Sequence, residues 1–120
     1  MRQANVREVR NARGSHEPLD LDDSGLMQAL RALADPTRFR MVQEIAAAGE
    51  LCCGDVKSLF DCSQPTVSHH LKVLHLAGLL SVRNAGKRRY TSVNRVMLSA
   101  VAAELPARLL PPRGRARARA

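Results

Sequence analysis

The sequence is poor in aromatic residues: its 120 residues include no Trp, one Tyr and two Phe. A core with so few rings must be filled by Leu, Val and Ala, which suits packed helices. Domains usually run to about 100 to 150 residues, so a chain of this length forms one domain with tails. The composition therefore predicts a single small domain that is mainly helical.

Cysteine is also scarce, and the count is odd, with Cys52, Cys53 and Cys62. An odd number argues against a secreted disulfide framework and is typical of reduced thiols in the cytosol. No apolar run approaches the ~18 residues of a membrane span, and the N-terminus lacks the apolar core of a signal peptide. We therefore expect a cytoplasmic protein without a membrane partner.

Signatures of catalysis are missing as well. The sequence contains no phosphate-binding loop, no nucleophile placed beside a base and no paired carboxylates. We expect that the protein is not an enzyme and that it requires no cofactor.

Positive charge is present in excess, and it is unevenly placed. The net charge is +8; residues 1–17 carry four Arg and two Glu, and residues 108–120 carry five Arg and no acid. Basic proteins are drawn to nucleic acid or anionic membrane, but net charge indicates affinity and not sequence preference. We expect a mobile arm over 1–20, a folded domain over 21–106 and a disordered Arg-rich tail over 107–120.

Start and stop signals divide the first half of the domain into helices. Asp22 begins a helix that runs to about residue 33, and Asp35 followed by Pro36 begins a second that Gly49 ends. A shorter helical pattern covers 51–60. The side chains expected to point inward from the second and third helices are Phe39, Val42, Ile45, Ala46, Val56, Leu59 and Phe60, whereas Arg38 and Arg40 are expected outside.

The next segment predicts a helix that enters a DNA groove. Ser63 is a good N-cap, and Gly78 follows the last helical residue as a terminator. Two short helices joined by a tight turn at 61–62 form a helix-turn-helix. The polar face carries base-reading candidates first and a cation one turn later: Gln64, Thr66, Ser68, His69 and Lys72. The alternative is an ordinary amphipathic surface helix.

After Gly78 the apolar period changes from 3.6 to 2, which predicts a β-hairpin. Strands over 79–83 and 89–93 flank a loop over 84–88 that contains Gly86. This hairpin is a wing, and Lys87, Arg88 and Arg89 at its tip are expected to meet phosphate or to enter the minor groove. A solvated loop that happens to be basic is the alternative.

A last helix over 95–105, closed by Pro106, is apolar around more than a narrow stripe and therefore needs a partner. With the first helix it could form a two-fold interface that sets two recognition helices on successive groove faces. The expected fold is mainly α with a small β-hairpin: a dimeric winged helix-turn-helix with five core helices and a two-stranded wing.

Four linked segments carry a resemblance to a known family. They read ALADPTR at 32–38, SQPTVSHHL at 63–71, AGL at 77–79 and GKRRY at 86–90. With them the chain resembles the ArsR/SmtB winged-helix repressors over roughly 26–105. The resemblance implies a homodimer that binds an imperfectly palindromic double-stranded operator, blocks transcription and lets go when an inducer binds.

The inducer site departs from the family pattern. Arsenite-responsive members carry Glu-Leu-Cys-x-Cys-Asp-Leu before the recognition helix, whereas residues 50–56 here read ELCCGDV. Soft three-coordinate ions take three thiolates. If the intervening residues are helical, a rise of ~1.5 Å each separates Cys62 from Cys53 by roughly 13 Å. The resemblance makes Cys52 and Cys53 candidate inducer thiols for arsenite or another soft ligand, and Cys62 a doubtful third. Core packing and redox switching are the alternatives.

Two further comparisons limit the choice of function. Zinc-type members place Asp and His ligands on the last helix, where this chain offers only Glu104. A sequence-blind nucleic-acid or architectural protein driven by the basic tail, and a winged helix that binds only protein, are the competing readings. The polar face of the recognition helix and the cationic wing favour an operator-specific regulator over both.

Overall fold

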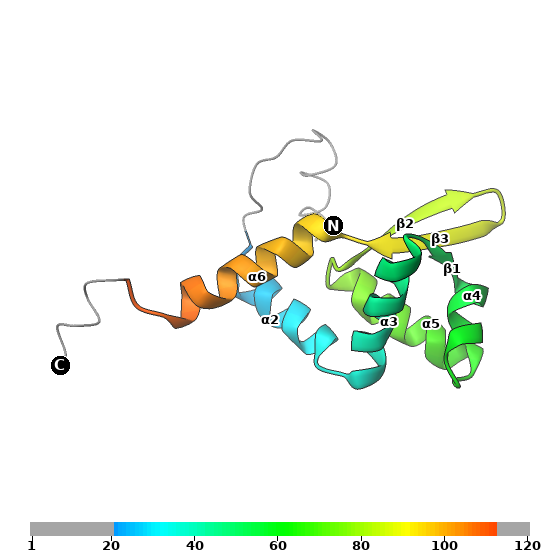
Figure 1. Cartoon of the computed structure of the whole chain (residues 1–120), viewed down its shortest axis with the longest axis horizontal. Coiled ribbons are helices and arrows are strands. Elements are labelled where there is room, and N and C mark those ends of the chain that lie inside the picture. The colour runs from blue at the N-terminus through cyan, green and yellow to red at the C-terminus, as the bar shows by residue number, and fades with distance from the viewer. Residues whose placement is uncertain (1–20, 113–120) are drawn as a thin grey trace.

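The computed structural model describes residues 21–112 and confirms a winged helix-turn-helix (Figure 1). Within this range the chain forms five helices and three strands. In chain order they are α2 (Asp23–Leu33), α3 (Pro36–Ala48), β1 (Leu51–Cys52), α4 (Cys53–Leu59), α5 (Gln64–Leu76), β2 (Leu80–Ala85), β3 (Arg88–Val93) and α6 (Arg95–Leu109). None of the described helices is long and apolar enough to cross a membrane. The arm expected over 1–20, and residues 113–120 of the expected tail, lie outside the described residues.

Capping side chains set where the helices begin, as the sequence predicts. Asp22, Asp35 and Ser63 each accept a hydrogen bond from the backbone N–H three residues on. At α3 this bond, donated by the N–H of Arg38, lowers the pKa of the Asp35 carboxyl. Each bond satisfies one of the N–H groups that a helix leaves unpaired at its start. These caps fix the register of α2, α3 and α5.

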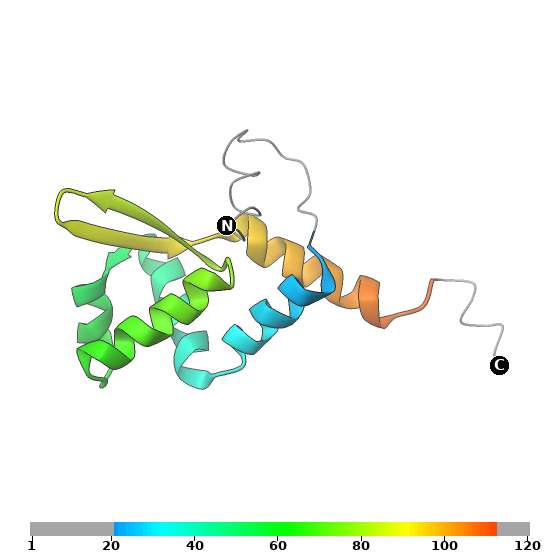
Figure 2. The same cartoon turned by 180° about the vertical axis from the view of Figure 1, so that it is seen from behind.

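Helices α3, α4 and α5 pack against the sheet, α2 and α6 lie together at the end away from the wing, and the hairpin of β2 and β3 projects from the body as the wing (Figures 1 and 2). The sheet is antiparallel, with strand order β1-β3-β2. The expectation of a helix from residue 51 was wrong, because Leu51 pairs with Thr91 and Cys52 with Tyr90. This short third strand joins the start of α4 to the wing.

The core is aliphatic, as the composition predicts. Its largest fully buried side chains are Met41, Ile45, Val56, Val67, Leu74, Leu79 and Leu80. Two expected core positions were wrong, since Phe39 is 51% exposed and Leu59 is 43% exposed. Residues two apart on a helix lie about 200° apart, so a buried Met41 turns Phe39 toward solvent. Val56 on α4 and Phe60 just after it are buried, as expected.

One buried polar side chain ties the end of α5 to the start of α6. The amide of Asn94, which is 5% exposed, donates to the Gly78 carbonyl at 2.9 Å and accepts from the Met97 N–H at 3.1 Å. Gly78 has a φ of 84°, in the left-handed region that glycine adopts freely. Both of the Asn94 bonds are internal, so its burial leaves these groups satisfied.

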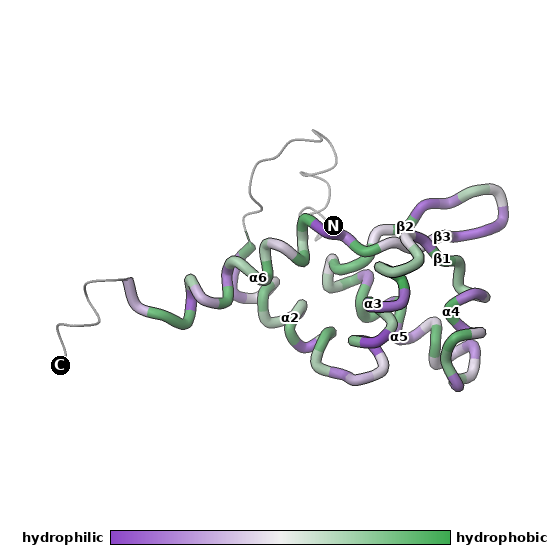
Figure 3. Tube along the Cα trace, viewed as in Figure 1, coloured by the Kyte–Doolittle hydropathy of each residue, from purple (hydrophilic) through white to green (hydrophobic). Residues whose placement is uncertain are grey.

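The last helix is longer than predicted, because Pro106 lies inside α6 and not at its end. The turn beyond it is held by Arg108, which pairs with Glu104 on α6 and with Asp23 on α2, and which donates to the Leu21 carbonyl. Apolar side chains are exposed along α2 and α6 and just after α6: Met27, Val96, Leu109 and Leu110. Figure 3 shows apolar stretches along both of these helices, away from the wing.

Candidate nucleic-acid interface

The face of α5 is divided between core and solvent. Val67 and Leu74 are fully buried, Leu71 is partly buried, and all five predicted base-reading or phosphate-contacting side chains of this helix, Gln64, Thr66, Ser68, His69 and Lys72, are exposed. The first turn is ordered locally: the Ser63 hydroxyl donates to Thr66 Oγ1 at 2.9 Å, and Gln64 Nε2 donates to Ser68 Oγ at 3.4 Å. The helix presents short polar groups in a defined arrangement.

A residue expected outside helps to hold α5 in place. Arg38 is half-buried: its Nε donates to the Ala32 carbonyl at 2.7 Å, and its Nη1 lies 3.3 Å from Nδ1 of His70. The guanidinium therefore links the end of α2 and the start of α3 to the middle of α5. Periodicity gave no sign of this contact, because a cation on a polar face normally indicates exposure.

The wing is a tighter hairpin than predicted. Ala85 pairs with Arg88, so only Gly86 and Lys87 form the turn, and Gly86 has a φ of 63°. The five-residue loop expected over 84–88 was wrong, because two-residue turns match the twist of paired strands once a residue accepts positive φ. Arg88 and Arg89 accordingly lie on β3 and not in a loop, and both are exposed.

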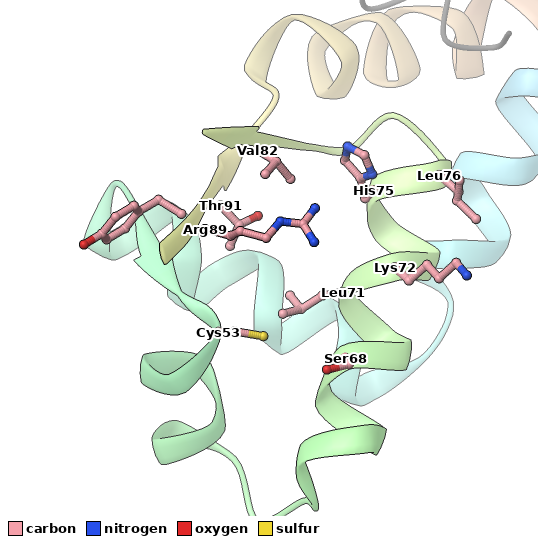
Figure 4. Close-up of a pocket in the computed structure, with 10 residues that line it drawn as sticks. Cys53, Ser68, Leu71, Lys72, His75, Leu76, Val82, Arg89 and Thr91 are labelled. Carbon is pink, nitrogen blue, oxygen red and sulfur yellow. The ribbon is translucent and has the colours of Figure 1, made fainter. Parts of the chain in front are cut away.

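Successive strand residues point to opposite faces, and this separates the two arginines. Arg88 Nη1 lies 3.9 Å from the Cys52 sulfur. Interactions with Tyr90 above all, and with Cys52 and Asp55, raise the pKa of Arg88. Arg89 instead extends across toward α5 (Figure 4). Among the predicted wing cations, only Lys87 occupies the turn itself.

A second ion pair fixes the base of the wing. Arg83 donates from Nε and Nη2 to the two carboxylate oxygens of Glu50, both at 2.9 Å, and its guanidinium lies 4.7 Å from the centre of the Tyr90 ring. The bidentate pair lowers the pKa of Glu50. The stability that this ion pair contributes to the fold is therefore present above the ordinary carboxyl pKa, and it is lost as the pH falls through the lowered pKa of Glu50. No local sequence pattern indicates this contact, because it joins residues 33 positions apart.

The two adjacent thiols each contact a predicted DNA-binding residue. Cys52 caps α4; its thiol donates to Asp55 Oδ2 at 3.1 Å, which lowers the pKa of Asp55, and it accepts from Arg88. The Cys53 sulfur accepts from Gln64 Nε2 at 3.6 Å. Cys62 packs against the core. In the part of the chain that the structure describes, no three His, Cys, Asp or Glu side chains gather to hold a metal ion.

Replacing Arg88 with alanine is expected to weaken binding to operator DNA and to random DNA to a similar extent. We expect this wing cation to meet phosphate, which carries no sequence information, so the slope of log affinity against log salt should fall by about one. Fluorescence anisotropy on both DNAs over a salt series measures the slope. Arg40→Ala is the matched control, since Arg40 already stacks on Phe60 at 4.8 Å. A loss confined to operator DNA would contradict the assignment of Arg88 to phosphate.

Known proteins resemble this chain over its helix-turn-helix segment. A family model described as a helix-turn-helix domain matches residues 33–83. The transcriptional repressor SdpR of Bacillus subtilis is 35% identical over 68 residues, which are 57% of this chain and 74% of that repressor. The arsenical resistance operon repressor of Escherichia coli is 43% identical over 61 residues, 51% of this chain and 52% of that protein.

Solved structures extend the likeness beyond the helix-turn-helix. A structure described as a possible transcriptional regulator for arsenical resistance has 31% identity and a TM-score of 0.60, and covers 78% of this chain and 95% of its own. The homodimeric winged helix-turn-helix DNA-binding domain of a Mycobacterium bovis protein shares the fold, with a TM-score of 0.58, 22% identity and coverage of 73% of this chain and 83% of its own.

Proposed function

The chain belongs to the ArsR family of winged helix-turn-helix transcriptional regulators, and from this premise we propose a homodimeric repressor. In this proposal the protein acts in the cytoplasm, binds a specific double-stranded operator and leaves it when an inducer binds. It acts by binding and not by catalysis. The observation that carries the proposal is the exposed polar face of α5 beside a cationic wing.

Base reading is assigned to the first half of α5. Gln64, Thr66, Ser68 and His69 are exposed and short enough to approach base edges in a major groove, while Lys72 lies one turn further along. Lys87, Arg88 and Arg89 supply phosphate contacts from the wing. A sequence-blind protein needs cations more than it needs this run of hydrogen-bonding side chains.

The dimer interface is assigned to α2 and α6. Both carry exposed apolar side chains, and an unpaired apolar face of this kind is costly in water. The homodimeric Mycobacterium bovis domain has the same fold. A two-fold pairing through these helices would leave α5 and the wing of each protomer free to meet successive half-sites of an operator.

Control by a thiol-reactive inducer is supported by two contacts. The Cys52 sulfur accepts a hydrogen bond from Arg88, and the Cys53 sulfur accepts one from Gln64. A ligand held by both sulfurs would therefore displace both of these predicted DNA-binding side chains from their present partners. The Escherichia coli relative is an arsenical resistance repressor. Arsenite, or another ligand with affinity for two thiols, is therefore the inducer class we propose.

Titration of the reduced protein on labelled DNA from its own promoter tests this function. We expect arsenite to release the DNA stoichiometrically, seen as a fall in fluorescence anisotropy. An oxidant is then tested on the same complex. Release should be lost in Cys52→Ser and Cys53→Ser and kept in Cys62→Ser. Tight binding that ignores both reagents would refute thiol control and leave the thiols as packing residues.

A further inference from the structure

A cavity of about 480 Å³ lies between α5 and the base of the wing (Figure 4). Its walls come from α4, α5 and both strands of the wing. They include Cys53 at the start of α4, Leu71 and Leu76 on α5, and Val82, Arg89 and Thr91 on the wing. The volume lies within the range of about 300 to 1,000 Å³ that is typical of small-molecule sites.

The lining combines an apolar wall with two cations, Arg89 on β3 and Lys72 on α5, and Figure 4 shows Lys72 directed away from the wing. Leu71, Leu76 and Val82 supply aliphatic surface. Figure 4 shows the guanidinium of Arg89 extending from β3 into the space toward α5, with the sulfur of Cys53 directed toward Leu71. An inorganic phosphate would pair with the guanidinium but leave the aliphatic side chains in contact with water. A neutral apolar compound would use the wall and leave the guanidinium unpaired.

We propose that this cavity binds a small organic anion, a carboxylate or sulfonate on an apolar body, with Arg89 pairing the anionic group. Arginine presents two parallel N–H donors to such a group, which gives the contact both strength and direction. The apolar body lies against Leu71 and Val82. The site differs from the Cys52 and Cys53 pair, because its anchor is the guanidinium and not a sulfur.

Occupancy of the cavity has a consequence for DNA, which rests on the function proposed above. Arg89, Ser68 and Lys72 line the cavity and also belong to the predicted DNA-binding set. An anion on Arg89 neutralises one of the wing cations, and its body lies beside Ser68 on α5. Ligand and DNA therefore compete for one surface, and the ligand acts as a second inducer.

The test uses two fluorescent probes that differ only in charge. Anilinonaphthalene sulfonate has an aromatic body and a sulfonate, and phenylnaphthylamine has the same body without it. In the full-length protein we expect Arg89→Ala to weaken binding of the sulfonate probe by about tenfold or more, the scale of one lost charged contact. The same change should leave phenylnaphthylamine unaltered. Arg88→Ala, the adjacent cation on the opposite face of β3, should alter neither, and Arg89→Lys should restore part of the sulfonate affinity.

A second measurement reads the cavity without relying on a variant. The sulfonate should slow alkylation of Cys53 by iodoacetamide and leave Cys62 unprotected, since only Cys53 of these two lines the cavity. Equal sulfonate affinity in Arg89→Ala and wild type, or no protection of Cys53, overturns the proposal. Neither readout needs DNA, so a failure to bind the promoter would refute the repressor and leave this result standing.

Discussion

Replacing Gln64 and His69 together with alanine is expected to weaken operator binding by about a hundredfold or more, because each good base contact contributes about 1 to 3 kcal/mol of discrimination. Both side chains are exposed in the first half of α5. Affinity for random DNA should change little, since that binding comes from phosphate contacts. Anisotropy titrations of both DNAs at one fixed salt concentration measure the two effects.

The single substitution Arg88→Ala serves as the matched control for that experiment. It should weaken binding to operator DNA and to random DNA alike, whereas the α5 variant should weaken binding to operator DNA alone. Gln64 also donates to Cys53, so the α5 variant should be compared with Cys53→Ala, which removes the acceptor sulfur and keeps the Gln64 amide. Equal losses on operator and random DNA for the α5 variant would refute base reading by this helix.

Replacing Leu74 with alanine is expected to lower the free energy of unfolding by about 2 to 5 kcal/mol, the usual cost of a cavity at a fully buried leucine. Leu74 is 0% exposed and holds α5 against the core. Urea unfolding followed by circular dichroism, at one fixed protein concentration because the protein is expected to dimerise, measures the change.

Leu76, two residues further along the same helix, provides the comparison. It is 59% exposed, so Leu76→Ala should change the free energy of unfolding by about 0.5 kcal/mol or less. A similar loss in both variants would mean that α5 does not bury the face described here.

Much of the fold could be predicted because its signals are local. Asp35, Ser63 and Gly78 mark helix ends through their own backbone chemistry, and the structure confirms each of them. What could not be predicted depends on distant partners. The pairing of Leu51 with Thr91 converts the expected first helical turn of α4 into a strand. The contacts of Arg108 with α2 accompany the continuation of α6 through Pro106.

The candidate site shows the same division. The exposed face of α5 follows from helical periodicity, and the cationic wing follows from composition around a glycine. The separation of Arg88 from Arg89 required the strand register, which depends on where the turn closes. The contacts of Cys52 and Cys53 with Arg88 and Gln64 join residues 36 and 11 positions apart, and no local pattern encodes them.

Affinity of the wild-type protein for its own promoter, compared with a scrambled duplex at physiological salt, tests the central claim most directly. The same comparison is made with protein that lacks the Arg-rich tail. The truncation begins at residue 113, because Arg108 anchors α6 to α2. We predict a preference for the promoter of about a thousandfold or more, kept after residues 113–120 are removed. Equal affinity for the two duplexes, lost with the tail, would contradict an operator-specific regulator and identify a sequence-blind binder.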